Sequence, residues 1–423
     1  MKRVLVISPH FPPVNAPDMQ RIRMSLPYFE EFDWEPVIIS VDEKYVNGFT
    51  DENLLDTVPG NIEIHRTKAL DNGLTKLVGI GNISLKSIYH IYKKGCELLS
   101  SQKFDLIFFT TSNFYVCTLG PLWKNKYEVP FVVDFQDPWY NDALNGKNGF
   151  HLPGKQDLSQ ALHKKLEAYT IPKSDGIISV SQGYIKVIKN RYNSYSKPSQ
   201  VLNFGSSVND FEVVANKKIN SFPLEKGKIN VVYPGALTPG FLPVIKAFFR
   251  AFKESNIKKD QYRFYFIGTS YFKTKKGILA DYIAENKLDG LIKEYTDRMA
   301  YFETLATMKS ADILFLPGSI DGDYNPSKIC NAIMSGTPVF SVFNRKSIVH
   351  ALINNSDAGI SIEFENTDTE EDIYLKIYGQ INNFQNLHKK ERGSVKTENI
   401  ADYSAKQLTK RLCEFFNEVI ETK

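Results

Sequence analysis

The sequence predicts an α/β protein with two Rossmann-like domains, each built on a doubly wound parallel sheet. Three observations favour this fold class. The chain has 423 residues, which corresponds to two or three domains of about 150 residues. Its short apolar runs are continuous rather than alternating, as in parallel strands that are covered on both faces. Helical patterns separate most of these runs, so strands and helices alternate as in βαβ units.

The first half of the chain contains seven expected strands. The first strand, Val4 to Ser8, precedes a helix-like stretch near Asp18 to Phe32. The other six strands are expected at 36–41, 62–67, 105–111, 131–135, 176–181 and 200–204. A polar stretch at 206–228 then interrupts the pattern, and we expect it to be a linker.

The same pattern restarts after this stretch and predicts a second domain. Six further strands are expected at 230–235, 262–268, 291–296, 313–318, 338–343 and 359–364. A last helical segment, Ile400 to Glu421, carries apolar residues at mostly helical spacing and should pack on a domain. The expected organisation is a first domain at 1–205, a linker at 206–228, a second domain at 229–399 and a C-terminal helix at 400–423.

Composition excludes several classes of protein. Apolar residues make up 42% and charged residues 24% of the chain, which argues against a disordered or fibrous protein. A net charge of +4 is too small to indicate nucleic-acid binding by itself. The four cysteines are widely separated, so neither a disulfide framework nor a zinc ribbon is indicated.

The same features predict where the protein acts. The first apolar run ends at Pro9, too early for a signal peptide, and no apolar run approaches the length of a membrane span. We therefore expect a cytoplasmic protein. Peripheral association with the inner face of the cytoplasmic membrane stays open, through the basic and apolar segment at 85–95, although a packed amphipathic helix also explains that segment.

The loop after the fourth expected strand of the second domain carries the clearest candidate site. The strand ends at Pro317 and Gly318, and Asn325 and Pro326 are suited to begin a helix. Lys328 would then lie in the first helical turn, where the helix dipole disfavours a cation. An anion such as phosphate would explain that position; a solvated lysine is the alternative.

Other strand ends of the second domain add candidates for ligand binding. Gly235 and Gly268 each follow a strand, where a missing side chain allows close approach of a ligand; ordinary turn glycines are the alternative. Arg298 could contact a phosphate or a base, or lie at the surface. Asn331 follows Lys328 by about one turn and could bond ribose hydroxyls or a neighbouring helix.

The first domain has fewer distinctive candidates. Its first strand is followed by a long loop that contains His10, Asn15, Arg21 and Arg23, and a structural role is favoured for each of them. Another strand ends with Asp134 and Asp137. An acid at this position could bind an acceptor hydroxyl or act as a base. Alternatively, Asp137 shapes a turn with the proline that follows it.

Several well-known motifs are absent. The sequence has no P-loop, no dinucleotide-binding glycine fingerprint after the first strand, no zinc-protease helix and no nucleophile elbow. Metal-binding clusters are also absent, so we expect neither a metal nor another cofactor.

Five segments, taken in order, resemble glycosyltransferase family 4 and its relatives of the GT-B fold. The segments are "SPHFPPVNAPDMQRIRMSLPYFEEFDWEPVIISV", "FVVDFQDPWYND", "VVYPGAL", "SADILFLPG" and "NPSKICNAIMSGTPVF". The resemblance spans nearly the whole chain. It implies two domains that face each other across a cleft, with a nucleotide-sugar donor in the second and an acceptor in the first. It also implies transfer that typically retains anomeric configuration and needs no bound metal.

The resemblance also implies roles for individual residues. Aligned on Pro326, Ser327 and Lys328, the two acids usual in the family fall at Asp323, which would bind sugar hydroxyls, and at Asn331, which would bind ribose. The basic pair that usually follows the first strand of the donor domain is missing. Lys328, with Arg298, would have to neutralise the diphosphate instead.

These departures leave alternatives open. The favoured function is transfer of a sugar from a nucleotide sugar to a glycan or lipid-linked acceptor in cell-surface polysaccharide assembly, with Asp137 at the acceptor. One alternative is a catalytically lapsed protein of the same fold that binds nucleotide or glycan and serves as a scaffold. The other is a nucleotide-sugar epimerase.

Overall fold

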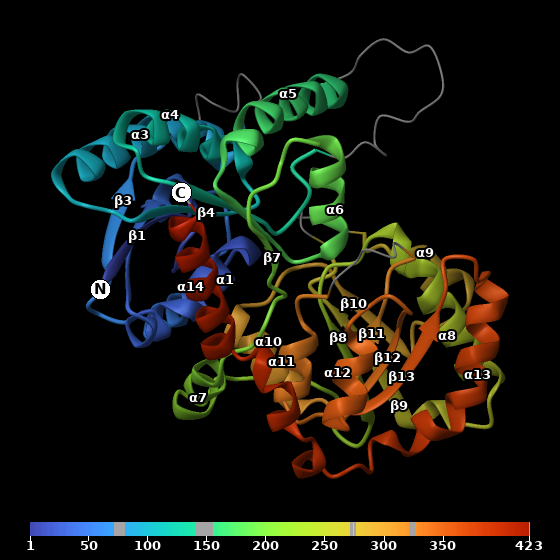
Figure 1. Ribbon diagram of the computed structural model, residues 1–423. Helices are drawn as coiled ribbons and strands as arrows, with labels where there is room; N and C mark the ends of the chain where they lie inside the picture. Colours follow the sequence, from blue (N-terminus) through green and yellow to red (C-terminus); the bar gives the residue numbers. More distant parts are fainter. Residues whose placement is uncertain (72–80, 141–154, 271–273, 275, 321–325, 423) are drawn as a thin grey trace. The chain divides into compact units, whose positions relative to one another are not determined.

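The computed structural model describes all residues except 72–80, 141–154, 271–273, 275, 321–325 and 423. The chain forms two compact units (Figure 1). The first unit combines Met1–Asn203 with Ala405–Lys423, and the second unit is Phe204–Ser404. The helix at the C-terminus therefore belongs to the unit that contains the N-terminus.

The first unit is built on a sheet of seven parallel strands in the order β3-β2-β1-β4-β5-β6-β7. Buried aliphatic and aromatic residues fill its central strands because both faces are covered. The strands are β1 (Lys2–Ile7), β2 (Trp34–Val41), β3 (Glu63–Thr67), β4 (Leu106–Thr110), β5 (Phe131–Phe135), β6 (Gly176–Ser179) and β7 (Ser199–Val201).

Helices cover both faces of this sheet and produce two apolar cores. Leu5 and Ile7 of β1 point into one core and Val4 and Val6 into the other, as the alternation of side chains along a strand requires. The helices are α1 (Gln20–Ser25), α3 (Ile83–Ser101), α4 (Leu119–Tyr127), α5 (Lys155–Thr170), α6 (Gln182–Arg191) and α14 (Ala405–Glu421).

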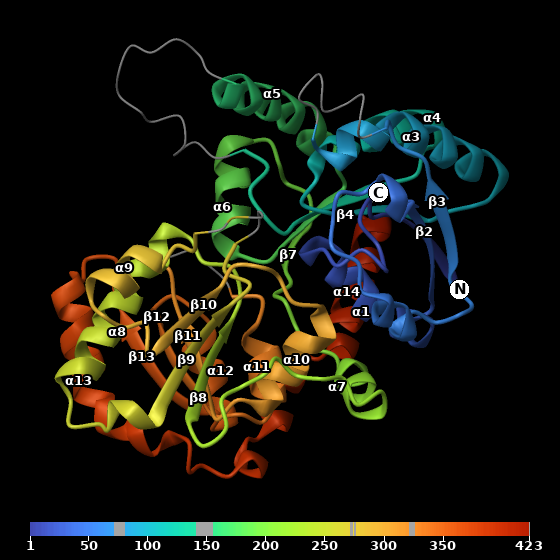
Figure 2. The same ribbon diagram turned by 180° about the vertical axis from the view of Figure 1, so that it is seen from behind.

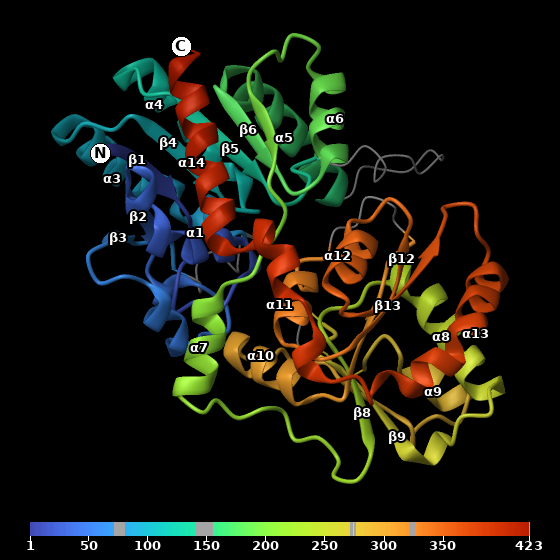
Figure 3. The ribbon, with the colours of Figure 1, turned by 60° about the horizontal axis from the view of Figure 1, so that its bottom comes forward.

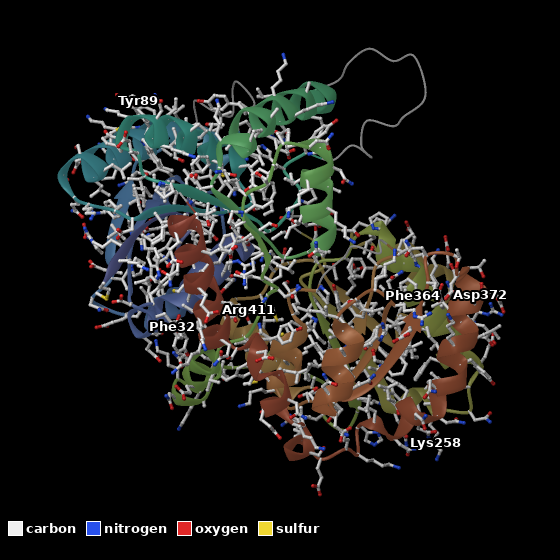
Figure 4. The ribbon with its side chains drawn as sticks, in the orientation of Figure 1. Phe32, Tyr89, Lys258, Phe364, Asp372 and Arg411 are labelled. Carbon is white, nitrogen blue, oxygen red and sulfur yellow. The ribbon has the colours of Figure 1, made fainter. Side chains whose placement is uncertain are left out.

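The C-terminal helix α14 supplies a large part of the second of these cores. It lies beside α1 (Figure 3). The Phe416 ring packs edge-on against Trp34 and Phe108, with ring centroids 5.3 and 5.1 Å apart. Arg411, labelled in Figure 4, donates a hydrogen bond of 2.9 Å to the backbone oxygen of Val201. Removing α14 would therefore expose one face of the first sheet.

The second unit has six parallel strands in the order β10-β9-β8-β11-β12-β13. Helices α8 and α13 pack side by side (Figure 2) over a core rich in phenylalanine, where the Phe248 and Phe315 rings are 4.4 Å apart. The strands are β8 (Ile229–Pro234), β9 (Tyr262–Ile267), β10 (Ile292–Tyr295), β11 (Ile313–Pro317), β12 (Val339–Asn344) and β13 (Gly359–Phe364). The helices are α7 (Val208–Asn216), α8 (Leu242–Glu254), α9 (Ala280–Glu285), α10 (Tyr301–Ser310), α11 (Ile329–Met334), α12 (Val349–Ser356) and α13 (Glu370–Leu387).

The expected fold class is confirmed, because both sheets are parallel throughout and are flanked by helices. The stretch expected as a linker, 206–228, contains helix α7 and clusters with the second unit. Of the expected C-terminal segment, 400–404 cluster with the second unit, and the helix proper begins at Ala405 in the first. Within the described residues, we find no helix with the length and apolarity needed to cross a bilayer.

Candidate functional site

Each sheet has one topological switch point, where ligands of doubly wound domains usually bind. In the first unit, β1 lies between β2 and β4; in the second, β8 lies between β9 and β11. The loops at the carboxyl ends of these strands contain most of the residues that the sequence singles out.

In the second unit, the ammonium group of Lys328 lies against Gly235, which directly follows β8. A methyl group added at Gly235 would lie 2.9 Å from the Lys328 Nζ atom, closer than real contacts of a Cβ atom allow. Lys328 comes after β11 in the sequence, so the two residues meet at the switch point of the sheet. The absence of a side chain at Gly235 is what leaves space for the lysine.

Gly268 and Arg298 extend the same edge of the sheet. Gly268 follows β9 with a φ angle of +73°, a conformation that favours glycine. A methyl group built on it would lie 3.6 Å from the Cα atom of Arg298, which follows β10. Arg298 is also close enough to Lys328 for its positive charge to affect the ionisation of that residue. The structure thus brings together four of the residues expected at the donor site.

The described surroundings of Lys328 disfavour its positive charge. Burial lowers the pKa of Lys328 to about 8, and the nearby positive charge of Arg298 lowers it further in the same direction. Nothing among the described residues raises this pKa, as a carboxylate next to the ammonium would. An anion bound here would relieve both the burial and the repulsion.

Asn331 is held within a short chain of hydrogen bonds. Its Nδ2 atom donates to the hydroxyl of Tyr301 at 3.4 Å, and this hydroxyl donates to Asp210 Oδ2 of α7 at 2.7 Å. The Asn331 Oδ1 atom is buried and has no partner among the described residues. The amide therefore bonds a neighbouring helix, as one of the two expected alternatives proposes, and its oxygen is left without a partner among the described residues.

The expected start of the helix near Asn325 and Pro326 is wrong. Helix α11 begins at Ile329 and has six residues, and its first backbone hydrogen bond runs from the Ala332 N–H to the Lys328 oxygen at 2.9 Å. Pro326 is buried and Ser327 exposed in the turn before it. So short a helix contributes little dipole, so the argument for an anion site depends on the lysine itself. Asp323 and Asn325 lie outside the described residues.

Pro317 and Gly318 have packing roles. Pro317 is the buried last residue of β11. The backbone N–H of Gly318 donates to the oxygen of Val342 at 2.7 Å. A methyl group at Gly318 would lie 2.7 Å from that oxygen, so the neighbouring strand β12 is sufficient reason for a glycine here.

The switch point of the first unit contains a paired acid and histidine. The Nδ1 atom of His10 lies 2.8 Å from Asp18 Oδ1, and both residues belong to the loop after β1. The other carboxylate oxygen of Asp18 accepts hydrogen bonds from Thr111 Oγ1 at 2.9 Å and Asn113 Nδ2 at 3.2 Å, both from the loop after β4. A buried carboxylate is therefore fixed in position by the two loops that flank the switch point.

A second buried pair of opposite charges joins Arg21 and Asp134. Arg21 Nε donates to Asp134 Oδ2 at 2.7 Å, and the same oxygen accepts from Thr110 and Gln136. Asp134, expected to bind substrate, has no exposed surface, and its contact with Arg21 holds helix α1 on the sheet. Arg23 is likewise internal and bonds Thr57 and Gln20.

Asp137 and Asn15 lie in different surroundings. Asp137 has exposed surface. Partial burial of its carboxyl group nevertheless raises its pKa to about 6, and the negative charge of Asp18 contributes in the same direction. It can therefore exchange a proton near neutral pH. Asn15 is buried, and its backbone N–H donates to the Phe49 oxygen at 2.8 Å.

Sequence reasoning gave little weight to His10 and did not single out Asp18, Thr111 or Asn113 for the site. These residues come from loops about ninety positions apart, so no local motif reveals them. The one available signal was that each follows an expected strand. Among the described residues, no group of histidine, cysteine and acidic side chains could hold a metal ion.

Comparisons with known proteins support the fold. Neither family models nor curated proteins match the sequence, but solved structures match along its whole length. Sucrose-phosphate synthase of Thermosynechococcus elongatus is 11% identical with a TM-score of 0.64, covering 100% of both chains. HepE of Anabaena, solved with UDP-glucose, is 13% identical with a TM-score of 0.59, covering 98% of this chain and 99% of that one.

A third similar structure is an α,α-trehalose-phosphate synthase (UDP-forming) of Burkholderia xenovorans, solved with glucose-6-phosphate. It is 9% identical with a TM-score of 0.63 and covers 98% of this chain and 100% of that one. At such identities the likeness shows a shared fold. Together with the two parallel sheets, it identifies the fold class as GT-B.

Proposed function

We propose that this protein is a glycosyltransferase that moves a sugar from a nucleotide-sugar donor to a hydroxyl of a glycan or lipid-linked acceptor in cell-surface polysaccharide assembly. The observation that carries the proposal is the partly buried ammonium of Lys328 at the switch point of the second unit, which no described carboxylate compensates. A diphosphate is the anion that best fits a lysine next to an arginine. The fold shared with structures solved with UDP-glucose supports the same ligand class.

Each residue of the second unit then has a task. Lys328 and Arg298 bind the diphosphate, while Gly235 and Gly268 allow its oxygens to approach the backbone. The unpartnered Asn331 Oδ1 accepts a ribose hydroxyl. Asp323 binds sugar hydroxyls, a role that depends on the resemblance alone. Asp137 of the first unit contacts the acceptor.

The main catalytic effect in this proposal is stabilisation of the leaving diphosphate. Negative charge builds up on the phosphate oxygens as the bond to the sugar breaks, and two preorganised cations favour that state over the ground state. These cations would supply the charge without a bound metal. If the departing diphosphate itself takes the acceptor proton, the reaction retains anomeric configuration, as the resemblance implies.

A lipid-linked acceptor would bring the protein to the cytoplasmic face of the membrane. Helix α3 exposes the Tyr89 and Tyr92 side chains beside Lys93, a combination suited to a lipid surface. Co-sedimentation with vesicles containing anionic lipid, compared with neutral vesicles, tests this part of the proposal.

The function itself is tested by a thermal-shift panel of UDP, GDP, ADP, CMP and their common sugar conjugates. Binding at a hundredfold excess over the dissociation constant stabilises a protein by about 2.7 kcal/mol. We expect one nucleotide family to raise the unfolding temperature, and its preferred sugar conjugate to be consumed when glycan acceptors are added. No shift from any nucleotide would contradict the proposal.

One observation favours a second candidate, a lapsed protein of the same fold. Where the resemblance implies an acid for ribose, this chain has Asn331, whose amide already bonds Tyr301. Nucleotide binding with no transfer to any acceptor would support the scaffold function. Conversion of the donor to its epimer without an acceptor would instead support an epimerase.

A further inference from the structure

Two polar side chains of the second unit accompany its two cations. Tyr301 follows Arg298 by three residues and is the first residue of α10. Asn331 follows Lys328 by three residues; because Lys328 directly precedes α11 in helical conformation, the two occupy neighbouring positions on one helical surface. Since α10 follows β10 and α11 follows β11, Tyr301 and Asn331 lie at the carboxyl edge of the sheet, where the cations lie.

The hydroxyl of Tyr301 has a fixed direction. It donates its single proton to Asp210 Oδ2 of α7 at 2.7 Å, a distance typical of a strong hydrogen bond to a carboxylate. Asp210 has no exposed surface, and its helix packs against α10. The carboxylate is therefore held where it takes the hydroxyl proton, and the hydroxyl oxygen of Tyr301 can only accept from other groups.

This direction determines how the side-chain amide of Asn331 is turned. Its Nδ2 atom donates to the Tyr301 hydroxyl oxygen at 3.4 Å. The reverse arrangement, with Oδ1 facing Tyr301, would set two acceptors against each other because the hydroxyl proton is already bonded to Asp210. The amide oxygen therefore lies on the side away from Tyr301. Asn331 is only 8% exposed, and this oxygen is buried with no partner among the residues that the structure describes.

A hydroxyl of the ligand would satisfy the buried oxygen. An acceptor that is buried without a donor costs folding free energy, and a nucleoside diphosphate bound at the neighbouring cations brings the hydroxyls of its ribose with it. A hydrogen atom in place of such a hydroxyl cannot donate. The direction of the hydrogen-bond chain, which runs from Asn331 through Tyr301 to Asp210, therefore determines which sugar the oxygen can accept.

We propose that Tyr301 and Asp210 are positioning residues that hold the Asn331 oxygen as a hydrogen-bond acceptor, so that the second unit selects ribonucleoside diphosphates over analogues that lack one ribose hydroxyl. The inference rests on the proposed function, which places the diphosphate at Lys328 and the ribose at Asn331. It adds that α7, within the stretch expected as a linker, takes part in the choice of donor through Asp210.

The selection is tested by calorimetry with the nucleoside diphosphate that gives the largest thermal shift and with its 2′-deoxy and 3′-deoxy analogues. The wild type should bind one of the analogues about tenfold less tightly than the parent, because that analogue leaves the Asn331 oxygen buried without a donor. Asn331→Ala should bind the parent and both analogues with equal affinity. Equal affinities of the wild type for all three ligands would overturn the inference and leave nucleotide binding intact.

The positioning role is tested by Tyr301→Phe and Asp210→Asn. Tyr301→Phe removes the acceptor that orients Nδ2, so the amide can turn and the tenfold preference should fall to about threefold or less. Asp210→Asn should act in the same direction, because an amide at this position can donate to Tyr301 and let the hydroxyl proton turn toward Asn331. Affinity for the disfavoured analogue should stay at the wild-type value, whereas a merely structural role would weaken all three ligands together.

Tyr265→Phe is the matched control. The hydroxyl of this buried tyrosine accepts from the Glu225 backbone N–H at 3.0 Å, before the amino end of β8, so the variant loses a tyrosine hydrogen bond at the opposite end of the sheet from Asn331. Its preference among the three ligands should be that of the wild type. An unchanged preference in Tyr301→Phe would overturn the positioning role alone. A wild type that binds no nucleotide would overturn the proposed function, and the inference with it.

Discussion

The two switch points of this molecule handle charge in opposite ways. In the first unit two buried carboxylates near the carboxyl ends of the strands face basic side chains, Asp18 facing His10 and Asp134 facing Arg21. In the second unit the partly buried ammonium of Lys328 lies near another cation, Arg298, and nothing described there raises its pKa. The first site has these pairs without a ligand, whereas the residues described around Lys328 give its ammonium no carboxylate partner.

The two arrangements of charge suit different chemical tasks. A compensated network holds atoms at fixed positions and suits proton transfer to or from a bound hydroxyl. An uncompensated cation costs stability until an anion arrives and therefore suits ligand binding. Opposite responses to mutation follow from this contrast: removing a charge should harm the first unit and stabilise the second.

The largest expected effect is in the first unit. Arg21→Met leaves Asp134 buried without its cation and should lower the free energy of unfolding by about 3–5 kcal/mol. All three tryptophans, Trp34, Trp123 and Trp139, belong to this unit, so their fluorescence during urea unfolding reports it separately.

The control for this variant is Lys94→Met, which breaks the surface pair with Glu97. It should cost at most about 0.5 kcal/mol. Equal losses of unfolding free energy in the two variants would mean that the buried pair contributes no more than a surface pair. This result would contradict a strongly stabilising charge pair in the first unit.

Lys328→Met is expected to raise the free energy of unfolding, in contrast to Arg21→Met. The pKa of Lys328 in the folded protein, about 8, lies below the value of 10.5 for a free lysine. The protonated lysine therefore destabilises the fold at every pH below 8, and this cost is relieved as pH rises from 8 to 10.5. Without ligand, the variant should be more stable than the wild type by about 1–3 kcal/mol at pH 7.

Circular dichroism during urea unfolding measures this gain, since the second unit has no tryptophan. The gain should shrink with rising pH and disappear above about pH 10.5. A loss of stability at pH 7 would show that the ammonium is already neutralised within the protein.

The same ionisation predicts how binding depends on pH. A nucleoside diphosphate should bind wild-type protein less tightly above pH 8, because the lysine then loses its charge, with up to about a tenfold loss per pH unit far above the pKa. Arg298 keeps its charge over this range. Calorimetry between pH 7 and 9.5 checks the slope, and Lys328→Arg should abolish it.

A smaller effect is expected from Gly235→Ala. The added methyl group would lie 2.9 Å from both Cε and Nζ of Lys328, so the flexible end of the lysine should move away. Affinity for the nucleoside diphosphate should fall by about tenfold, the value of one weakened charged hydrogen bond. Gly290→Ala, with nothing within 4 Å of the added methyl group, is the control; equal affinities in both variants would contradict the contact.

Much of the fold was predictable because continuous apolar runs mark buried parallel strands. The rule that ligands bind at strand ends also placed Gly235, Gly268, Arg298 and Lys328 correctly at one edge of the sheet. The start of α11 was not predictable: Asn and Pro favour a helix start locally, but the helix forms three residues later.

The pair of His10 and Asp18 shows the other limit. Its second carboxylate oxygen is fixed by Thr111 and Asn113, which come from another strand end. Such contacts depend on how two loops pack against each other, and this packing cannot be read from the spacing of residues in the sequence. A lone histidine in a loop is therefore ambiguous until the fold places its partner.

Calorimetry with Lys328→Ala tests most directly whether a diphosphate binds at Lys328. It compares the affinity of this variant for the preferred nucleoside diphosphate with its affinity for the corresponding nucleoside. Lys309→Ala, an exposed lysine of the same unit, is the control. We expect a loss of roughly 10- to 100-fold in affinity for the diphosphate, with little change for the nucleoside and none in the control. Equal losses for both ligands would contradict a diphosphate at Lys328.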